Sequence, residues 1–228
     1  DLPVRENLEF FGGLFDLEGA VLRARVEQAL VQANLEGDAD RPTGALSTGV
    51  RQRLALGSAL LHEPRLVFLD EPTGGVDPIS RRAFWRWIDA TAARGVTVVV
   101  TTHSLDEAEH CDRIALFHAG RRIRSGTVAE LKHVFAGRVM FEVRCARFAE
   151  AMEALEREPW ILEVAVFGTR LHVVTLDAPE APTRLGAFLH ERGHTDAVVA
   201  PIVPSLEDVF IHTILEADAI AEANAGTG

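Results

Sequence analysis

The chain has 228 residues, of which 47% are hydrophobic and 25% are charged, the usage of a globular protein with one large or two small domains. Its formal net charge of -11 argues against nucleic acid as a partner, because phosphate backbones bind clustered positive charge. No apolar stretch approaches the roughly 18 residues that a membrane-spanning helix needs, and the two cysteines lack the spacing of a disulfide framework or a zinc ribbon, so we expect a soluble chain in a reducing cytosol.

The first part of the chain is predicted to be helical over residues 4–36. Apolar residues recur there at helical spacing in two stripes, Leu8, Phe11, Leu14 and Phe15, and then Val26, Leu30 and Ala33. After a polar connector over residues 37–44, Ser47 is a good N-cap for a further helix, which Pro64 ends.

A buried strand that ends in two acids is predicted from "LVFLDEPTGGVDP", residues 66–78. Its apolar run without alternation is typical of a strand covered on both faces of a parallel sheet. Successive side chains of a strand point to opposite faces, so Asp70 and Glu71 cannot share one proton and must serve two different roles. Carboxylates at the carboxyl end of a parallel strand lie where open α/β sheets bind ligands, and we expect a cation nearby.

The next elements complete a βαβ unit over residues 65–101. Asp77 followed by Pro78 predicts a capped helix start, and Gly95 ends that helix. "VTVVVT", residues 96–101, reads as a second buried strand, parallel to the first. The stretch "RIALFHAGRRIRSG" then predicts a strand and a hairpin.

A second pattern begins near Gly137 and predicts a βαββαβ, ferredoxin-like region. Its expected strands and helices follow in order: strand 138–145, helix 147–157, strands 161–167 and 170–175, helix 181–192 and strand 195–202. Ser205 with Asp208 is a start similar to a capping box, for a helix to about Leu215, followed by a frayed tail. The predicted domains are therefore 1–136, 137–203 and the helix and tail over 204–228.

The motifs "LSTGVRQRLALGSALLHEPRLVFLDEPTGGVDP" and "TTHSLDEAEHCDRIALF" resemble, in this order and spacing, the ATP-binding subunits of ABC transporters. "EPTGGVDPISRRAFWRWI" and "PSLEDVFI" are similar to the drug and multidrug exporters with ABC-2-type permeases. The resemblance implies an α/β fold with a P-loop NTPase-like ABC ATPase core. We expect this core to be a truncated parallel sheet with a helical subdomain (about 1–63) and a catalytic part (about 64–136), followed by a smaller α+β ferredoxin-like domain.

The resemblance also implies roles for the residues around the acidic pair. Asp70 is expected to hold Mg²⁺ through water, and Glu71 to polarise the water that attacks ATP. His103 is similar to the switch histidine that contacts the γ-phosphate, and Asp77 lies in the loop that signals to the opposite subunit. These assignments agree with the separate roles that the strand geometry requires of the two acids.

The stretch "LSTGV", residues 46–50, resembles the signature motif usually written LSGGQ. Ser47, Thr48 and Gly49 are therefore expected to contact a phosphate of ATP bound on the partner subunit, because a helix N-terminus carries partial positive charge. Thr48 replaces the first glycine and Val50 the glutamine of the family motif. The contacts of Ser47 and Gly49 are expected more firmly than that of Thr48, whose side chain crowds a close approach.

A phosphate-binding loop G-x-x-x-x-G-K-[ST] is absent, since the one lysine is Lys132 in "AELKHVF". The chain also begins with Asp1 rather than methionine. We expect that the N-terminal third of the ATPase domain, with this loop, is not included, and that the 228 residues alone hydrolyse ATP poorly or not at all.

The expected function is that of an exporter ATPase that uses ATP and Mg²⁺ and pairs with an identical or different ATP-binding subunit. It is expected to drive an ABC-2-type permease at the cytoplasmic face of the plasma (inner) membrane. The alternatives are a natively truncated partner module without its own activity, and an ATPase of this superfamily outside transport. A zinc site at His103, Glu107, His110 and Cys111 is a further alternative, although these residues match neither H-E-x-x-H nor a C-x-x-C arrangement. The βαββαβ region is either an appendage or, by analogy alone, a small-ligand regulatory domain.

Overall fold

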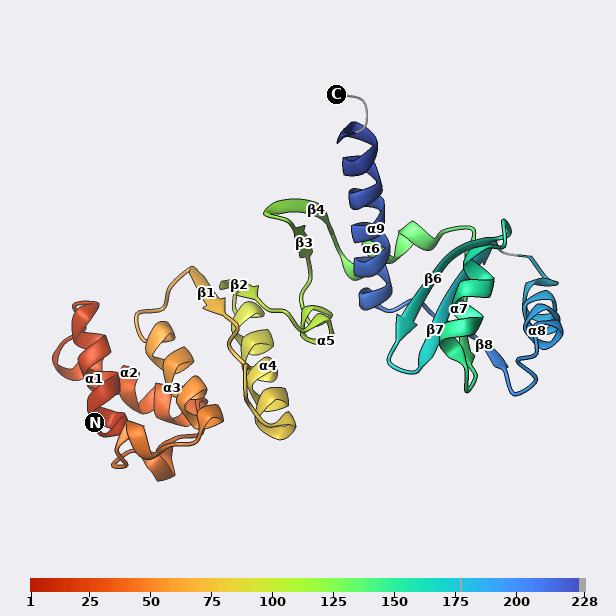
Figure 1. The fold of residues 1–228 in the computed structure, drawn as a ribbon. Helices are drawn as coiled ribbons and strands as arrows, with labels where there is room; N and C mark the ends of the chain where they lie inside the picture. The colour runs from red at the N-terminus through yellow and green to blue at the C-terminus, as the bar shows by residue number, and fades with distance from the viewer. Residues whose placement is uncertain (177, 226–228) are drawn as a thin grey trace. The chain divides into compact units, whose positions relative to one another are not determined.

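The computed structural model divides the chain into two compact units, Asp1–Ser104 and Leu105–Gly228. It describes residues 1–176 and 178–225, with residues 220–225 by their backbone alone. Figure 1 shows the order of the elements along the chain by colour. Elements of the first unit are α1 (Val4–Leu14), α2 (Gly19–Gln32), the short 3-10 helices η1 (Glu36–Asp38) and η2 (Thr43–Ala45), α3 (Thr48–Leu60), β1 (Leu66–Asp70), α4 (Pro78–Ala92) and β2 (Thr97–Thr101).

Over residues 4–36, where the sequence predicted helix, the structure has two α-helices, α1 and α2. The break follows Leu14, and the chain turns there with positive φ at Asp16 and Gly19. Apolar residues of α1, α2 and α3 form one core, whose buried members include Val4, Leu8, Val26, Leu30, Leu54 and Leu61. Of the first predicted stripe only Leu8 is buried, while Phe11, Leu14 and Phe15 are exposed.

Strands β1 and β2 pair in parallel and in register, as predicted, with Asp70 directly opposite Thr101. The prediction that this sheet is covered on both faces is wrong. Val67 is buried, but Leu66 is 46% and Phe68 73% exposed. Each strand has a single neighbour among the described residues, so one face of an apolar strand is open, whereas parallel sheets are normally covered on both.

The second unit holds an antiparallel hairpin and a four-stranded antiparallel sheet. Its elements are α5 (Leu105–Ala108), β3 (Ile114–His118), β4 (Arg121–Gly126), α6 (Val128–Lys132), η3 (His133–Phe135), β5 (Arg138–Arg144), α7 (Phe148–Glu156), β6 (Ile161–Phe167), β7 (Arg170–Leu176), α8 (Ala181–Glu191), β8 (Val198–Ile202) and α9 (Leu206–Ala225). The larger sheet has the order β6-β7-β5-β8, so the predicted βαββαβ plan is confirmed. Gly168 turns the central hairpin with positive φ, as a two-residue hairpin loop requires.

Two apolar clusters hold this second unit together. One joins strands β5 and β7 to α7 and α8 through Phe141, Leu155, Leu171 and Leu185. The other joins the β3–β4 hairpin, α6, the remaining side chains of β5 and β7, and α9; its members include Leu116, Leu131, Met140, Val174 and Val209. Since this second cluster spans the predicted boundary at 136/137, the compact units divide earlier, after Ser104, and the predicted domain limits stay a prediction.

Helix α9 is longer than predicted. It runs from Leu206 to Ala225, where the sequence suggested an end near Leu215 and a frayed tail. The extension is rich in Ala and Glu, which are strong helix formers. Residues 226–228 of the expected tail lie outside the described residues.

Candidate functional site

The carboxyl ends of β1 and β2 bring an acid and a hydroxyl together. Thr101 Oγ1 donates a hydrogen bond to Asp70 Oδ1, because the parallel register places the two residues opposite one another. Both residues are exposed. A carboxylate has two oxygens that each accept hydrogen bonds or bind metal, so the hydrogen bond from Thr101 leaves the second oxygen of Asp70 open to a ligand.

Glu71 contacts a different partner, His103. The Nδ1 atom of His103 lies 3.1 Å from Glu71 Oε1, and both side chains are more than half exposed. The backbone N–H of Glu71 donates to the carbonyl oxygen of Thr101 at 2.9 Å. The side chains of the two adjacent acids therefore have different partners, Thr101 for Asp70 and His103 for Glu71.

The backbone of Glu71 is strained. Its φ is 42°, in the left-handed region that non-glycine residues rarely adopt. Such strained residues cluster at functional sites, where the surrounding structure holds them in place. Asp16, Asn34, Glu63 and Ala119 also have positive φ, so the conformation of Glu71 is consistent with a functional site but does not identify one by itself.

The loop after Glu71 ends at Asp77, which caps helix α4. Asp77 Oδ1 accepts hydrogen bonds from the backbone N–H groups of Ile79 and Ser80, each at 3.0 Å. The pKa of the Asp77 carboxyl lies below its usual range because the side chain and the backbone N–H of Ser80 stabilise its charged form. Within the described chain Asp77 is thus a helix cap, and its expected role toward an opposite subunit stays a prediction.

The signature stretch lies at the start of α3, with Ser47 at the N-cap position. The Ser47 side chain is exposed and makes no capping hydrogen bond, so its hydroxyl and the first N–H groups of α3 are available to an anion. Thr48 is half-buried, and its hydroxyl lies 3.5 Å from Arg51 Nη2.

Gly49 has a different environment from Ser47, because it is buried against the start of α4. A Cβ atom at Gly49 would lie 3.0 Å from Ser80 Cβ and 3.3 Å from Val76 Cγ1. The glycine is therefore required for packing inside the unit, a role that the sequence did not suggest. Its expected contact with a phosphate stays a prediction.

The predicted site residues thus form two groups. One contains Asp70, Glu71 and His103, and the other joins Ser47, Thr48 and Gly49 to the loop that ends at Asp77. Sequence reasoning missed Thr101 in the first group and Ser80 in the second. A hydroxyl residue at the exit of the predicted second strand was the available signal for Thr101, but only the strand register shows which side chain it contacts.

The first group fits a magnesium ion that is held mainly by water and phosphate. Mg²⁺ prefers oxygen ligands and is usually bound by one or two carboxylates together with waters and substrate phosphates. Asp70 supplies one exposed carboxylate of this kind. Across residues 1–176 and 178–225 there is no group of three or more His, Cys, Asp or Glu side chains that could hold a metal ion by themselves, so the zinc reading gains no support.

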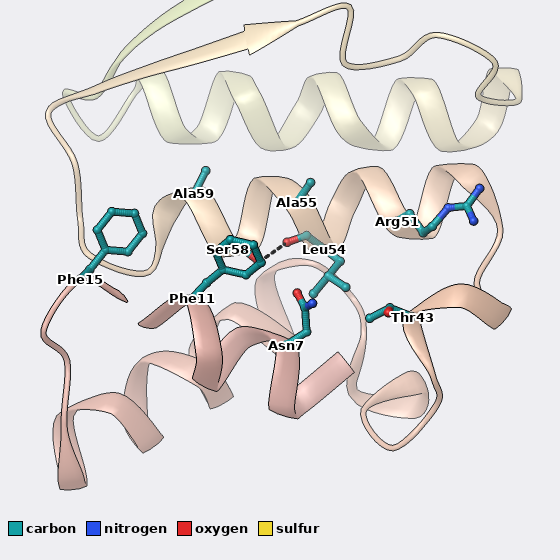
Figure 2. A pocket seen from close by; sticks show the side chains of 9 residues that line it. All are labelled: Asn7, Phe11, Phe15, Thr43, Arg51, Leu54, Ala55, Ser58 and Ala59. Atoms are coloured by element: carbon teal, nitrogen blue, oxygen red, sulfur yellow. Dashed lines mark hydrogen bonds between the residues drawn. The ribbon is translucent and has the colours of Figure 1, made fainter. Parts of the chain in front are cut away.

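A groove between α1 and α3 is the other notable feature of the first unit (Figure 2). Its volume is about 450 Å³. In Figure 2 Phe15 lies at one end of the lining side chains and Thr43 and Arg51 lie at the other, with Phe11, Asn7 and Leu54 between them. The hydroxyl of Ser58 donates to the carbonyl oxygen of Leu54 at 3.0 Å, so this buried polar group is satisfied and the groove stays mainly apolar.

Two protein families match parts of the chain. Residues 4–107 match the family described as "AAA domain, putative AbiEii toxin, Type IV TA system". Residues 126–214 match "ATP-binding protein DrrA1-3-like, C-terminal domain". The second match covers the β4–α9 region, including the four-stranded sheet.

Curated relatives are similar over most of the chain. It is 34% identical over 212 residues to "Nod factor export ATP-binding protein I" of a Rhizobium species, covering 92% of this chain and 67% of the relative. It is 36% identical to "Daunorubicin resistance ATP-binding protein DrrA2" of Streptomyces coeruleorubidus, covering 92% and 66%. Against "Probable multidrug ABC transporter ATP-binding protein YbhF" of Escherichia coli the identity is 47% over 132 residues, and the match spans 58% of this chain but only 23% of that relative.

Solved structures share the fold. A structure titled "Structure of ATP binding subunit of ABC transporter" is similar with a TM-score of 0.52 and 29% identity, covering 59% of this chain and 57% of the other. "Dimeric Structure of MJ0796, a Bacterial ABC Transporter Cassette" is similar with a TM-score of 0.50 and 30% identity, covering 55% and 56%. The similarity at this level of identity extends the sequence relation to the three-dimensional fold.

Proposed function

The chain belongs to the ATP-binding subunits of ABC transporters, in the group of the DrrA and Nod factor export proteins, and from this premise we propose that it hydrolyses ATP to drive an ABC-2-type exporter. The observation that carries the proposal is the pairing at the β1 end, where Glu71 meets His103 and Asp70 meets Thr101. This arrangement supplies separate groups for water activation and for metal binding, the two tasks that phosphoryl transfer asks of a protein.

In the proposed reaction Glu71 orients and polarises a water molecule, and His103, which contacts Glu71, holds the γ-phosphate. Asp70 takes part in binding Mg²⁺, which when present neutralises charge on the phosphates. Both acids are exposed at the strand end, so a nucleotide can reach them without a rearrangement of β1. Ser47 at the start of α3 is proposed to contact ATP bound on a second subunit.

The partners are proposed from the relatives. A second ATP-binding subunit, identical or different, is supported by the dimeric ABC cassette with the same fold, and a permease by the relatives whose names describe export. The structure has no helix, over its described residues, that is long and apolar enough to cross a membrane. We also propose that the protein lies peripherally at the cytoplasmic face of the membrane. The permease would then bind in the apolar groove between α1 and α3.

Substitution of Glu71 by glutamine in the intact subunit tests the proposed reaction. Loss of the carboxylate that activates water should lower ATP turnover by at least about 100-fold, while ATP binding is retained, because glutamine keeps the size and hydrogen-bonding capacity of the side chain. Turnover is measured by phosphate release and binding by equilibrium dialysis.

The matched control is Glu36→Gln, which changes an exposed acid of the same unit and should leave turnover unchanged. If Glu71→Gln hydrolyses ATP as fast as the unsubstituted subunit, Glu71 has no role in the reaction and the proposed function loses its basis.

A partner module without ATPase activity is the second candidate function. Residues 1–228 contain no phosphate-binding loop with a lysine, and Lys132 lies in the last turn of α6 in the second unit. Under both candidates residues 1–228 alone should hydrolyse no ATP and bind it only weakly. Calorimetric titration of residues 1–228 with ATP measures this binding, and a sub-millimolar affinity would contradict the expectation of weak binding.

The two candidates differ in the intact protein. An exporter ATPase restores its own nucleotide site there, whereas a partner module acquires activity only when a different subunit is added. A superfamily ATPase outside transport is the least supported alternative, because the curated relatives named above are export, resistance or multidrug transporter proteins.

A further inference from the structure

Thr101 contacts the β1 end through both its side chain and its backbone. Its hydroxyl donates to Asp70 Oδ1, and its carbonyl oxygen accepts the N–H of Glu71 at 2.9 Å. Two residues further along the chain, His103 contacts the Glu71 side chain. The end of β2 therefore holds both acids of β1 in place.

A purely structural role for Thr101 is the simpler explanation, since threonine suits strands and adds to sheet stability. Thr97, at the other end of the same strand, allows the comparison. Thr97 is also exposed, but it lies opposite Leu66, and its hydroxyl therefore has no carboxylate as its cross-strand neighbour. The preference of threonine for strands is enough to explain Thr97, whereas the hydroxyl of Thr101 also donates a hydrogen bond to Asp70.

The hydrogen bond from Thr101 affects how Asp70 presents its carboxylate. It restricts rotation of the Asp70 side chain, occupies one oxygen and leaves the other oxygen free. Substitution of residues that orient a metal-binding carboxylate in this way typically lowers metal affinity by about 10- to 100-fold.

We propose that Thr101 is a positioning residue that fixes Asp70 for the binding of Mg²⁺ with the nucleotide. This inference rests on the proposed function and deepens it, because it separates the metal-binding acid from the water-activating one. The side chain of Thr101 serves Asp70, while Glu71 is held by the Thr101 backbone, which a side-chain substitution leaves in place.

The test is Thr101→Val in the intact subunit, since valine keeps the branched shape and removes only the hydroxyl. The Mg²⁺ concentration needed for half-maximal hydrolysis should rise by about 10- to 100-fold, with turnover at saturating Mg²⁺ close to that of the unsubstituted subunit. Thr101→Ser should restore the Mg²⁺ dependence, and the matched control Thr97→Val should leave it unchanged. Equal Mg²⁺ dependence in Thr101→Val and the unsubstituted subunit would overturn the inference.

A second measurement needs no turnover. In a Glu71→Gln background with ATP, the affinity for Mn²⁺ as a probe is measured by electron paramagnetic resonance, with and without Thr101→Val. Weaker Mn²⁺ binding with valine supports the inference, and unchanged binding overturns it. Absence of hydrolysis in the unsubstituted intact subunit would instead remove the proposed function, and the Mn²⁺ measurement would still decide on Thr101.

Discussion

At the scale of single residues, the candidate site depends on backbone positions that tolerate little change. Glu71 adopts a left-handed φ of 42°, and a Cβ atom at Gly49 would lie closer to Ser80 and Val76 than side chains normally pack. These two positions lie on either side of one connection, since the loop from Glu71 leads to the start of α4, against which Gly49 packs. The packing at Gly49 therefore links the signature stretch to the loop that follows the catalytic candidate.

Replacement of Gly49 by alanine is expected to destabilise the protein, although alanine normally favours helix over glycine. The new Cβ would lie 3.0 Å from Ser80 Cβ and 3.2 Å from its hydroxyl, and overpacking of this kind costs about 1–3 kcal/mol. Ser80→Gly removes both atoms and should recover most of the loss. Urea unfolding of the two single variants and the double variant measures this coupling, and additive effects would show that Gly49 and Ser80 do not pack as described.

At the scale of elements, α9 is attached to the sheet of the second unit by histidine–carboxylate contacts as well as by apolar contacts. Asp208, in its first turn, accepts hydrogen bonds from Ser205 and lies 2.6 Å from His172 Nδ1 on β7. One turn later, His212 Nδ1 lies 2.5 Å from Glu163 Oε2 on β6. The helix that begins with the "SLEDVF" stretch is thereby fixed to two neighbouring strands.

The Asp208 pair predicts a pH dependence of stability. Burial raises the pKa of Asp208, but the hydrogen bonds from His172 and Ser205 outweigh it and hold the pKa below the ordinary value of 3.8. A carboxyl whose pKa is lower in the folded state stabilises the protein above the unfolded-state pKa, and this stabilisation is lost as the pH falls through the folded-state pKa.

Asp208→Asn should therefore lower the free energy of unfolding by about 2 kcal/mol at pH 6, the usual contribution of hydrogen bonds to a charged group. The difference from the unsubstituted protein should shrink as the pH falls below 3.8. Denaturant unfolding at a series of pH values measures it, with Glu207→Gln, an exposed acid of the same helix turn, as the control. A difference that persists undiminished at the acid end would contradict the charge-based account.

At the scale of the whole molecule, two features have opposite effects on self-association: an open apolar strand face and a strongly acidic net charge. The net charge of -11 opposes association, whereas Phe68, 73% exposed on a two-stranded sheet, favours it, because exposed apolar strands template pairing with other chains.

We expect residues 1–228 to self-associate through the face that carries Phe68, increasingly so as added salt screens the charge. Phe68→Gln should reduce this association, whereas Ile79→Gln, which changes an apolar side chain of similar exposure (74%) on α4, should have little effect. Light scattering over a range of protein and salt concentrations measures both. Association that the two substitutions lower equally would show that general hydrophobicity, and not the strand face, is responsible.

The amino-acid sequence alone determined the βαβ unit over residues 65–101, the βαββαβ plan and the family. These features depend on local patterns: alternation within strands, helical spacing in α3 and α4, turn residues such as Gly168, and motifs of fixed spacing. They can be read along the chain because each involves residues within a few positions of one another.

Only the tertiary structure decided what covers each apolar face and which side chains meet. It showed that Phe68 is open, that Gly49 packs against Ser80, that Thr101 holds Asp70, and that His172 pairs with Asp208. An apolar run indicates that a face is favourable to bury, but the element that covers this face is remote in the chain. The partner of a polar side chain is often equally remote. Such contacts are set by the register and packing of separate elements, which local periodicity does not contain.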